Sequence, residues 1–230
     1  MKKYAYLFLP IGFIVLFVIY TILVKTVDVT YLSDINAFLG FSRWNITVDD
    51  WVNYDINAFR TMKVMSDIIF YISFVFPVAF GILFCVQWIK RKSLSKIDRS
   101  LYIMLGTSVI ACFIYFLFEI VKVNYSPLSV PTSMKASYPS THVFLGCVFY
   151  ATGLATTYDV LDIKSDGLKA GISIATILLL ALLGFVRLLS RRHWISDIVG
   201  AYLLVAAILC VYFTLRHYLI LEPKKEALEA

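Results

Sequence analysis

Two of the three histidines in this chain lie in short polar clusters whose residue types suit phosphate chemistry. The first cluster is Pro139-Ser140-Thr141-His142, and the second joins Arg187, His193 and Asp197. Residues four apart share a face of a helix, so we expect Asp197 to hydrogen-bond the imidazole of His193 and fix its tautomer. An arginine beside such a pair can bind an anionic group.

These residues supply the roles that hydrolysis of a phosphate ester requires. The reaction needs positive charge on the phosphoryl oxygens, an in-line nucleophile and an acid for the leaving oxygen. His193 is the candidate nucleophile, which would give a phosphohistidine, and His142 is the candidate acid. The candidate phosphate ligands are the local backbone amides and the side chains of Lys122, Ser140, Thr141 and Arg187. We expect no metal and no other cofactor, because no cluster of metal ligands accompanies the histidines.

Each candidate residue also has a structural interpretation. A histidine at a helix end is often an ordinary interfacial residue, and arginines near a membrane surface can contact lipid headgroups. Asp197 can serve as a negative charge at a helix N-terminus, and Lys122 can be a lysine that extends toward the interface. Two spaced sets of residues on one predicted face of the membrane favour the functional interpretation.

The elements that must position these residues are membrane helices. The 230-residue chain is 60% hydrophobic and has a mean hydropathy of +0.82. About 20 apolar residues cross a hydrocarbon core, and continuous apolar runs in lipid indicate helices. We expect spanning helices over residues 4–24, 64–89, 101–121, 143–158, 168–189 and 198–219. The prediction is an all-α fold, a bundle of six transmembrane helices, in a single domain over residues 1–230.

Several features refine this prediction. The first apolar run follows Lys2 and Lys3, but it is long and has no small-residue cleavage site, so we expect a retained helix. Pro77 predicts a kink in the second helix. The four cysteines lie within apolar runs without the spacing of metal ligands, and we expect them to pack as small apolar residues.

The connection at about 25–63 is expected to be an outer interfacial segment. Within it, Asp34-Ile-Asn-Ala-Phe38 recurs as Asp55-Ile-Asn-Ala-Phe59. The repeat is interpreted either as two amphipathic turns on the lipid surface, anchored by Trp44 and Trp51, or as a coincidence within an irregular loop. Asn45 begins a glycosylation triplet of a kind that is common by chance.

The net charge of +6 predicts a topology. The connection at 90–99 is rich in lysine and arginine, so the positive-inside rule places it in the cytoplasm. The two termini, with Lys2, Lys3, Lys224 and Lys225, then lie on the same side. Both histidine clusters fall on the outer face, and we expect a plasma-membrane protein. The basic charge therefore indicates topology and not a nucleic-acid partner.

With these residues the sequence resembles the type 2 phosphatidic acid phosphatase superfamily of membrane lipid phosphatases. The family motifs are Lys-x6-Arg-Pro, Pro-Ser-Gly-His and Ser-Arg-x5-His-x3-Asp. The second motif matches except for Thr141 in place of glycine, and the third except for Val186 in place of serine. The resemblance spans nearly the whole chain and implies a ping-pong mechanism. His193 would attack phosphorus, His142 would protonate the leaving group, and water would then cleave the phosphoenzyme.

The first motif is incomplete in this chain. Lys122 fits its lysine, but Ser129 and Val130 stand where the family has arginine and proline. One cation that binds phosphate is therefore missing. The candidate replacements are Lys135, which we favour because its loop delivers His142, and Arg191 or Arg192, which flank His193.

We expect a metal-independent phosphatase that acts at the outer membrane face on a lipid phosphate or diphosphate. An undecaprenyl-type polyprenyl diphosphate or phosphatidylglycerol phosphate is the expected kind of substrate, which suggests a role in cell-envelope lipid metabolism. The alternatives are a lipid phosphotransferase and a non-catalytic membrane protein that binds anionic lipid. The expected partners are the lipid substrate and the bilayer, with no nucleic acid.

Overall fold

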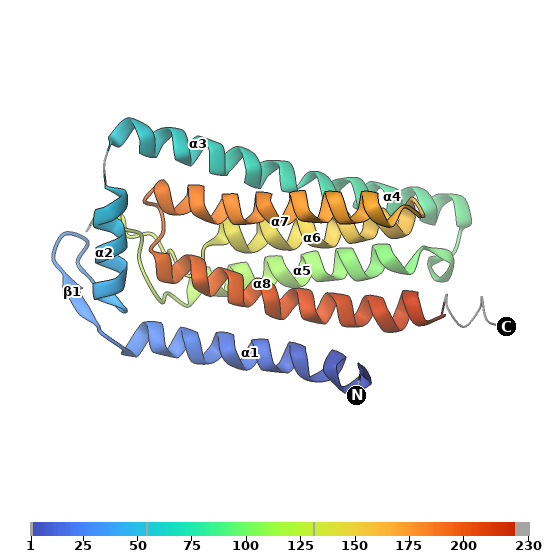
Figure 1. Ribbon diagram of the computed structural model, residues 1–230, viewed down its shortest axis with the longest axis horizontal. Helices are drawn as coiled ribbons and strands as arrows, with labels where there is room; N and C mark the ends of the chain where they lie inside the picture. The colour runs from blue at the N-terminus through green and yellow to red at the C-terminus, as the bar shows by residue number, and fades with distance from the viewer. Residues whose placement is uncertain (1, 54, 131, 224–230) are drawn as a thin grey trace.

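The computed structural model describes residues 2–53, 55–130 and 132–223 and consists mainly of long helices that run side by side (Figure 1). Six candidate spans are long and apolar enough to cross a membrane, as predicted. The helices that form them are α1 (Lys2–Thr26), α3 (Ile56–Ser73), α4 (Val75–Arg91), α5 (Arg99–Ile120), α6 (Thr141–Val160), α7 (Asp166–Leu189) and α8 (Ile195–Arg216). The predicted all-α membrane fold is confirmed.

Helices α3 and α4 together form the second span, and they are separated at Phe74. Pro77 lies three residues further on and has no N–H to donate to the carbonyl of Ser73. The break in the helix therefore falls where the kink was predicted.

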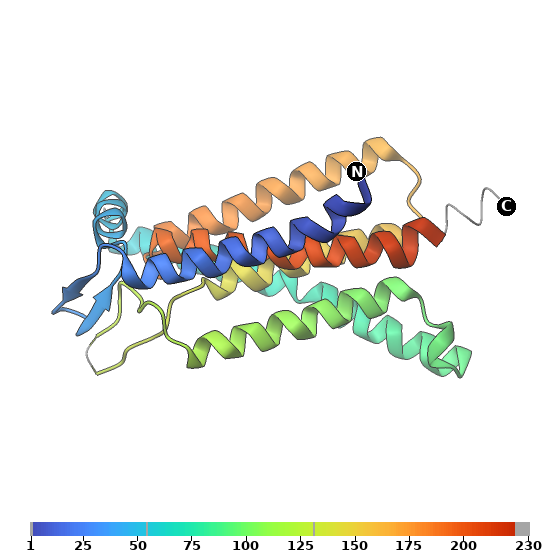
Figure 2. The same cartoon turned by 90° about the horizontal axis from the view of Figure 1, so that it is seen from below.

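Helix α6 is the most buried of the spans, with 67% of its apolar window inside the protein. It packs against α3, α5, α7 and α8, and both views place it between α5 and α7 (Figures 1 and 2). Because protein covers this helix, it tolerates buried polar residues such as Thr152 and Thr156 that lower its hydropathy. The helix extends two residues beyond the predicted span of 143–158 at each end, to Thr141 and Val160.

The outer segment has its own secondary structure. Strands β1 (Thr30–Leu32) and β2 (Ala37–Leu39) pair as an antiparallel hairpin, and helix α2 (Ser42–Val52) lies across the end of the bundle (Figure 1). The first copy of the repeated pentapeptide forms the hairpin turn and part of β2, whereas the second caps and begins α3. The expectation of two matching amphipathic turns is therefore wrong, and so is that of an irregular loop.

Helix α2 is joined to α8 through Asn45. The Asn45 amide donates to the carbonyl of Gly40 at 2.8 Å and to Oγ of Ser196 at 2.9 Å, and its oxygen accepts from the Ser196 amide at 3.1 Å. Asn45 is 1% exposed. This side chain is a structural link and is not accessible for glycosylation.

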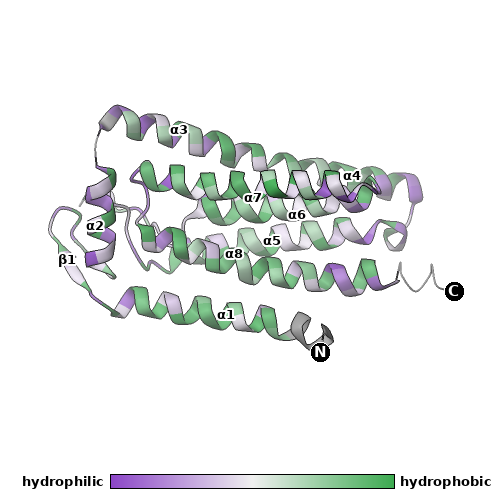
Figure 3. Ribbon diagram, in the orientation of Figure 1, coloured by the Kyte–Doolittle hydropathy of each residue, from purple (hydrophilic) through white to green (hydrophobic). Residues whose placement is uncertain are grey.

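Hydropathy divides the bundle into an apolar middle and two polar ends (Figure 3). The hairpin and α2 lie at one end (Figure 1). The basic connection after α4, which includes the short 3-10 helix η1 (Leu94–Lys96), lies at the other end with the start of α1 and the π-helical turn η2 (His217–Leu221). Lys224 and Lys225, and the side chains of Lys2 and Lys3, lie outside what the structure describes. The chain is an integral membrane protein by its spans, and the side of the membrane that each end faces stays a prediction.

Candidate active site

A cavity of about 330 Å³ lies at the hairpin end of the bundle, where both histidine clusters meet. It is formed by α3, α5, the start of α6, the end of α7 and the loops beside them. Its lining residues are Lys63, Asp67, Tyr71, Tyr115, Glu119, Ser126, Lys135, Ala136, Thr141, His142, Arg187, Arg192 and His193. The structure thus brings together residues that lie more than 120 positions apart in the sequence.

His193 lies in the turn between α7 and α8, and its Nδ1 atom is 2.8 Å from the carbonyl oxygen of Ser137. A carbonyl can only accept a hydrogen bond, so Nδ1 carries the proton and Nε2 has the free electron pair. The distance from Nδ1 to Oδ2 of Asp197 is 3.8 Å, which is too long for a hydrogen bond. The predicted direct hydrogen bond to Asp197 is therefore wrong, and a backbone carbonyl fixes the tautomer.

Asp197 is fully buried and holds the start of α8. Its Oδ2 accepts from the backbone amide of Trp194 at 3.0 Å, and its Oδ1 accepts from the side-chain amide of Asn124 at 3.1 Å. With its oxygens bound in this way, the carboxylate lies at ion-pair distance, 3.8 Å, from Nδ1 of His193. It remains close enough to stabilise positive charge on the His193 ring through space.

The electrostatic environment keeps His193 in its neutral form. Burial lowers the pKa of His193 below its ordinary value, and the Arg187 cation lowers it further, against the opposing effects of Asp197 and the Ser137 carbonyl. A neutral imidazole is the form that can act as a nucleophile. The hydrogen bond from Nδ1 to the Ser137 carbonyl and the lowered pKa of His193 therefore both favour Nε2 as the nucleophilic atom.

The sequence analysis missed Asp67, a carboxylate of α3 that joins the two histidine clusters. Its Oδ1 lies 3.1 Å from Nε2 of His142 and 3.2 Å from Nη1 of Arg187. Its Oδ2 accepts from Nζ of Lys63 at 2.6 Å. A sequence signal existed, because an ionisable residue within a predicted span is a functional candidate and Lys63 precedes it by one helical turn.

Two further contacts fix the positions of His142 and Arg187. The His142 ring packs against Phe70 with ring centroids 4.2 Å apart. Arg187 also donates to Oγ of Ser66 at 3.2 Å. Helix α3 therefore orients both the candidate acid and the candidate phosphate ligand.

The start of α6 and the end of α7 carry hydrogen-bond donors that are available to an anion. Oγ of Ser140 and Nε of Arg187 are buried without a hydrogen-bond partner in the part of the chain that the structure describes. The amides in the first turn of a helix also lack partners within the helix and favour an anion. Thr141 and Arg187 line the cavity. Ser140 is fully buried beside it, and its backbone amide donates to the carbonyl of Asp197 at 3.1 Å, so the predicted phosphate ligand Ser140 does not reach the cavity in this structure.

Lys122 is not brought to the cavity. Helix α5 ends at Ile120, and the exposed Lys122 side chain lies near Tyr125, with Nζ 6.0 Å from the ring centroid. The Lys122 carbonyl accepts from Nζ of Lys25 at 3.3 Å, on the side of α1. The lysine that fits the first motif by sequence therefore does not meet Arg187 and His142 in this structure.

The loop after Lys122 folds back as an irregular hairpin. The backbone amide of Ser126 donates to Lys135 and that of Ser137 donates to Asn124, while Oγ of Ser126 donates to the Arg192 carbonyl. Ser129 is buried in the turn of this loop, and its Oγ accepts from the Lys135 amide. Ser129 therefore has a structural role in this turn and is not among the residues that line the cavity. Pro131 lies outside the described residues.

The three candidate replacements for the missing arginine have different positions. Lys135 and Arg192 line the cavity. Arg191 instead pairs with Asp49, donates to Asn53 at 2.7 Å and packs over the Phe59 ring at 5.3 Å. Arg191 therefore binds α2 and the start of α3, away from the cavity.

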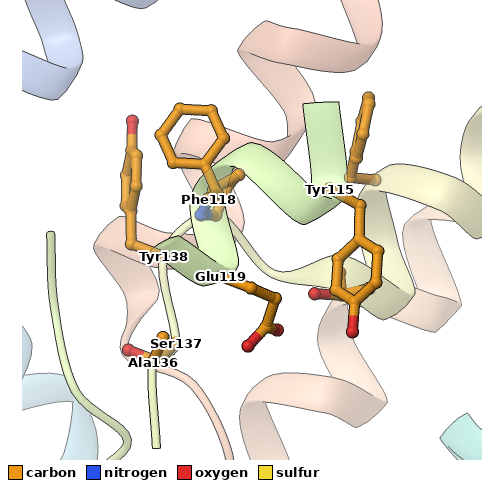
Figure 4. Close-up of a pocket in the computed structure, with 9 residues that line it drawn as sticks. Tyr115, Phe118, Glu119, Ala136, Ser137 and Tyr138 are labelled. Carbon is orange, nitrogen blue, oxygen red and sulfur yellow. The ribbon is translucent and has the colours of Figure 1, made fainter. Parts of the chain in front are cut away.

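A smaller cavity of about 10 Å³, close to the size that one water needs, adjoins the site. It lies between the end of α5 and the segment that carries Ser137 and Tyr138 (Figure 4). It shares Tyr115, Glu119, Ala136 and Thr141 with the larger cavity. Within the described residues, no group of three or more His, Cys, Asp or Glu side chains is arranged to hold a metal.

Comparisons with known proteins identify the family and the fold. A sequence model of the PAP2 superfamily matches residues 107–221, which is half of the chain and contains the three motif regions. The fold is similar to the crystal structure of the first transmembrane PAP2 type phosphatidylglycerolphosphate phosphatase from Bacillus subtilis. The TM-score is 0.63 and the identity is 14%, over 92% of this chain and 96% of that one. No curated protein matches the chain.

Proposed function

This chain belongs to the PAP2 superfamily, and we propose that it hydrolyses a lipid phosphate through a phosphohistidine on His193. Membership confirms the resemblance stated from the three motifs. The family and the fold support the expected enzyme class, a lipid phosphatase. The substrate, the mechanism and the membrane face are the proposal.

The observation that carries the mechanism is the state of His193. Its Nδ1 is engaged with the Ser137 carbonyl at 2.8 Å, so Nε2 presents the electron pair in a cavity that Arg187 and His142 also line. A nucleophile, a cation and an acid meet at one place, which is what phosphoryl transfer needs.

The reaction proceeds in two steps. Nε2 of His193 forms a bond to phosphorus while the bond from phosphorus to the lipid oxygen breaks, and His142 gives a proton to that oxygen. Arg187, Thr141 and the first amides of α6 hold the phosphoryl oxygens, and Asp197 stabilises the charge on the phosphorylated ring. Water then attacks phosphorus, His142 takes one of its protons, and phosphate leaves with His193 restored.

A lipid can reach this cavity from the side. Residues of α3 and α5 face each other across it, and both helices pack on α6 but not closely on each other in the described part of the chain. The outer surfaces of both helices expose large apolar residues such as Ile68 and Phe116. We propose that the phosphate enters the cavity while the hydrocarbon chain stays in the bilayer, as for a polyprenyl diphosphate or phosphatidylglycerol phosphate.

The membrane side of the site is part of the same proposal. The cavity is lined by the start of α6 and the end of α7. These helix ends lie at the end of the bundle opposite the connection after α4 (Figure 1), whose sequence includes Lys90, Arg91 and Lys92. If that connection is cytoplasmic, the site faces outward. The plasma membrane is the location that this arrangement suits, with both ends of the chain inside. The single-domain organisation over residues 1–230 also stays a prediction.

The test is phosphate release from a lipid phosphate by the purified protein in the presence of chelator. Wild type is expected to release phosphate and to carry an acid-labile, base-stable phosphoryl group during turnover. His193→Ala should lose both, because no other side chain supplies the nucleophile. Arg43→Gln, an exposed change on α2, is the control and should retain activity. Full activity in His193→Ala would contradict the mechanism.

The same assay separates the alternative functions. A phosphotransferase would form the phosphohistidine but release phosphate only slowly until an alcohol acceptor is added. A protein that only binds anionic lipid would form no phosphohistidine with any lipid phosphate.

A further inference from the structure

We propose that Lys63 of α3 supplies the phosphate-binding cation that the first motif lacks, and that the phosphoryl group takes the place of the Asp67 carboxylate. This inference rests on the proposed phosphatase function. It assigns a binding role to a residue that lies outside all three motifs. The site would thus obtain one of its cations from a membrane helix instead of from the loop after α5.

The first motif leaves a deficit of positive charge. Lys122 is exposed and lies on the side of Lys25, away from the cavity. Ser129 is buried in a turn where its hydroxyl is bound to the Lys135 amide. Neither position can bring a cation to a phosphate held by Arg187.

Lys63 lies where that cation is needed. It lines the cavity, and its Nζ is 2.6 Å from Oδ2 of Asp67. The other oxygen of the same carboxylate lies 3.1 Å from Nε2 of His142 and 3.2 Å from Nη1 of Arg187. Lys63, Arg187 and His142 are therefore all within reach of one small anionic group.

The Asp67 carboxylate marks the position of that group. Ammonium, guanidinium and imidazole donors bind carboxylate and phosphate oxygens with the same geometry. A phosphoryl group in this place would contact the acid His142 and the cation Arg187, as the proposed mechanism requires. A phosphate dianion carries more charge than a carboxylate, so it can displace Asp67 from the three donors.

The other residues of the cavity favour this exchange. Among the described residues, the cavity is lined by four basic side chains, Lys63, Lys135, Arg187 and Arg192, and by two acidic ones, Asp67 and Glu119. The excess of positive charge attracts a second anion in addition to the internal one. Asp67 then acts as a competing ligand that holds the donors in position until the substrate arrives.

The experiment measures binding of orthovanadate, a phosphate analogue, to the purified protein in detergent. The readouts are inhibition of lipid phosphate hydrolysis and the rise of Tm with added vanadate. Lys63→Met is expected to weaken vanadate binding about tenfold or more, the loss expected for a charged hydrogen bond. Lys63→Arg keeps the cation and should retain binding. Asp67→Asn removes the competing charge and should bind vanadate more tightly than wild type.

The control is Arg60→Met, which removes an exposed cation one turn earlier on the same helix and outside the cavity lining. It should change vanadate binding by no more than about twofold. The proposal is overturned if Lys63→Met behaves like Arg60→Met, or if Lys122→Met gives the tenfold loss instead. Weaker binding in Asp67→Asn would overturn the exchange of carboxylate for phosphate.

The Tm readout keeps this test apart from the proposed function. If wild type releases no phosphate from any lipid, the phosphatase proposal fails, but vanadate still reports whether Lys63 binds a phosphate-like anion. If wild type is active and Lys63→Met binds vanadate normally, only the role of Lys63 fails. Tm without vanadate shows whether each variant is folded.

Discussion

At the scale of single residues, the sequence predicted which side chains lie close together but not which hydrogen bonds they make. The spacing of Arg187, His193 and Asp197 placed them at one site, which the structure also shows. The hydrogen-bond partner of His193 was not predictable, because a backbone carbonyl has no signature in the sequence. The spacing of Asp197 and His193 allows a hydrogen bond between the two side chains. In the structure, Asn124 and the Trp194 amide bind the carboxylate oxygens instead.

The pKa of His193 leads to a prediction about pH. Burial lowers this pKa, so the neutral nucleophile should persist below pH 6.5, the ordinary value for histidine. The decrease of kcat/KM on the acid side of the pH profile (the acid limb), which follows protonation of His193, is therefore expected below that value. Asp197→Asn removes a charge that favours the protonated ring, so the limb should move to still lower pH.

Profiles of kcat/KM against pH for wild type and Asp197→Asn check this prediction. Ionisation of the substrate affects both profiles equally, so the difference between them reports His193. A limb that moves to higher pH in Asp197→Asn would contradict the assigned electrostatics.

His142 gives a second prediction at this scale. His142→Ala should slow hydrolysis of an alkyl phosphate by about 10²–10⁴, the typical contribution of general acid catalysis. An aryl phosphate should lose much less, because its leaving group needs no proton. Comparing kcat for the two substrates in wild type and variant is the measurement. Equal losses would assign His142 to binding and not to proton transfer.

At the scale of elements, hydropathy predicted the helices because each apolar run must satisfy its backbone within lipid. It did not predict their mutual arrangement. Nothing in the sequence pattern says that α3 lies against α6 and α7, and this packing is what places Asp67 beside His142 and Arg187. The hairpin and α2 were missed for a related reason, since short polar elements carry weak periodicity.

The link between α2 and the turn that carries His193 leads to a third prediction. Arg191 adopts a left-handed backbone conformation with φ of 51°, which is unfavourable for a residue with a side chain. Its guanidinium is bound by Asp49, which raises the pKa of Arg191. We expect Arg191→Gln or Asp49→Asn to destabilise this turn by about 1.5–3 kcal/mol and to lower kcat, because His193 lies two residues away.

A double-mutant cycle in Tm and kcat measures the coupling of this pair. The exposed pair Arg43 and Asp28, 3.9 Å apart, is the matched control and should show little coupling. Additive effects of Arg191→Gln and Asp49→Asn would mean that α2 and the turn that carries His193 are independent.

The whole molecule has a polar site at one end and a basic connection at the other, and this polarity was predictable because charge determines insertion. The prediction is an outward site. In a version without its four cysteines, Ser133→Cys should react with an impermeant thiol reagent in whole cells, and Ser95→Cys should react only after permeabilisation. Both positions are exposed, so burial does not limit either reaction. The reverse pattern would place the site in the cytoplasm.

The proposed entry of a lipid between α3 and α5, which both line the cavity, would also change what substrate concentration means for this protein. A lipid whose chain never leaves the bilayer approaches the site by diffusion in two dimensions. The quantity that governs the encounter is then the number of lipid phosphates per unit area of membrane and not their number per unit volume. A small pool of substrate therefore suffices when it is concentrated in one leaflet, and neutral lipids slow the reaction simply by occupying the surface.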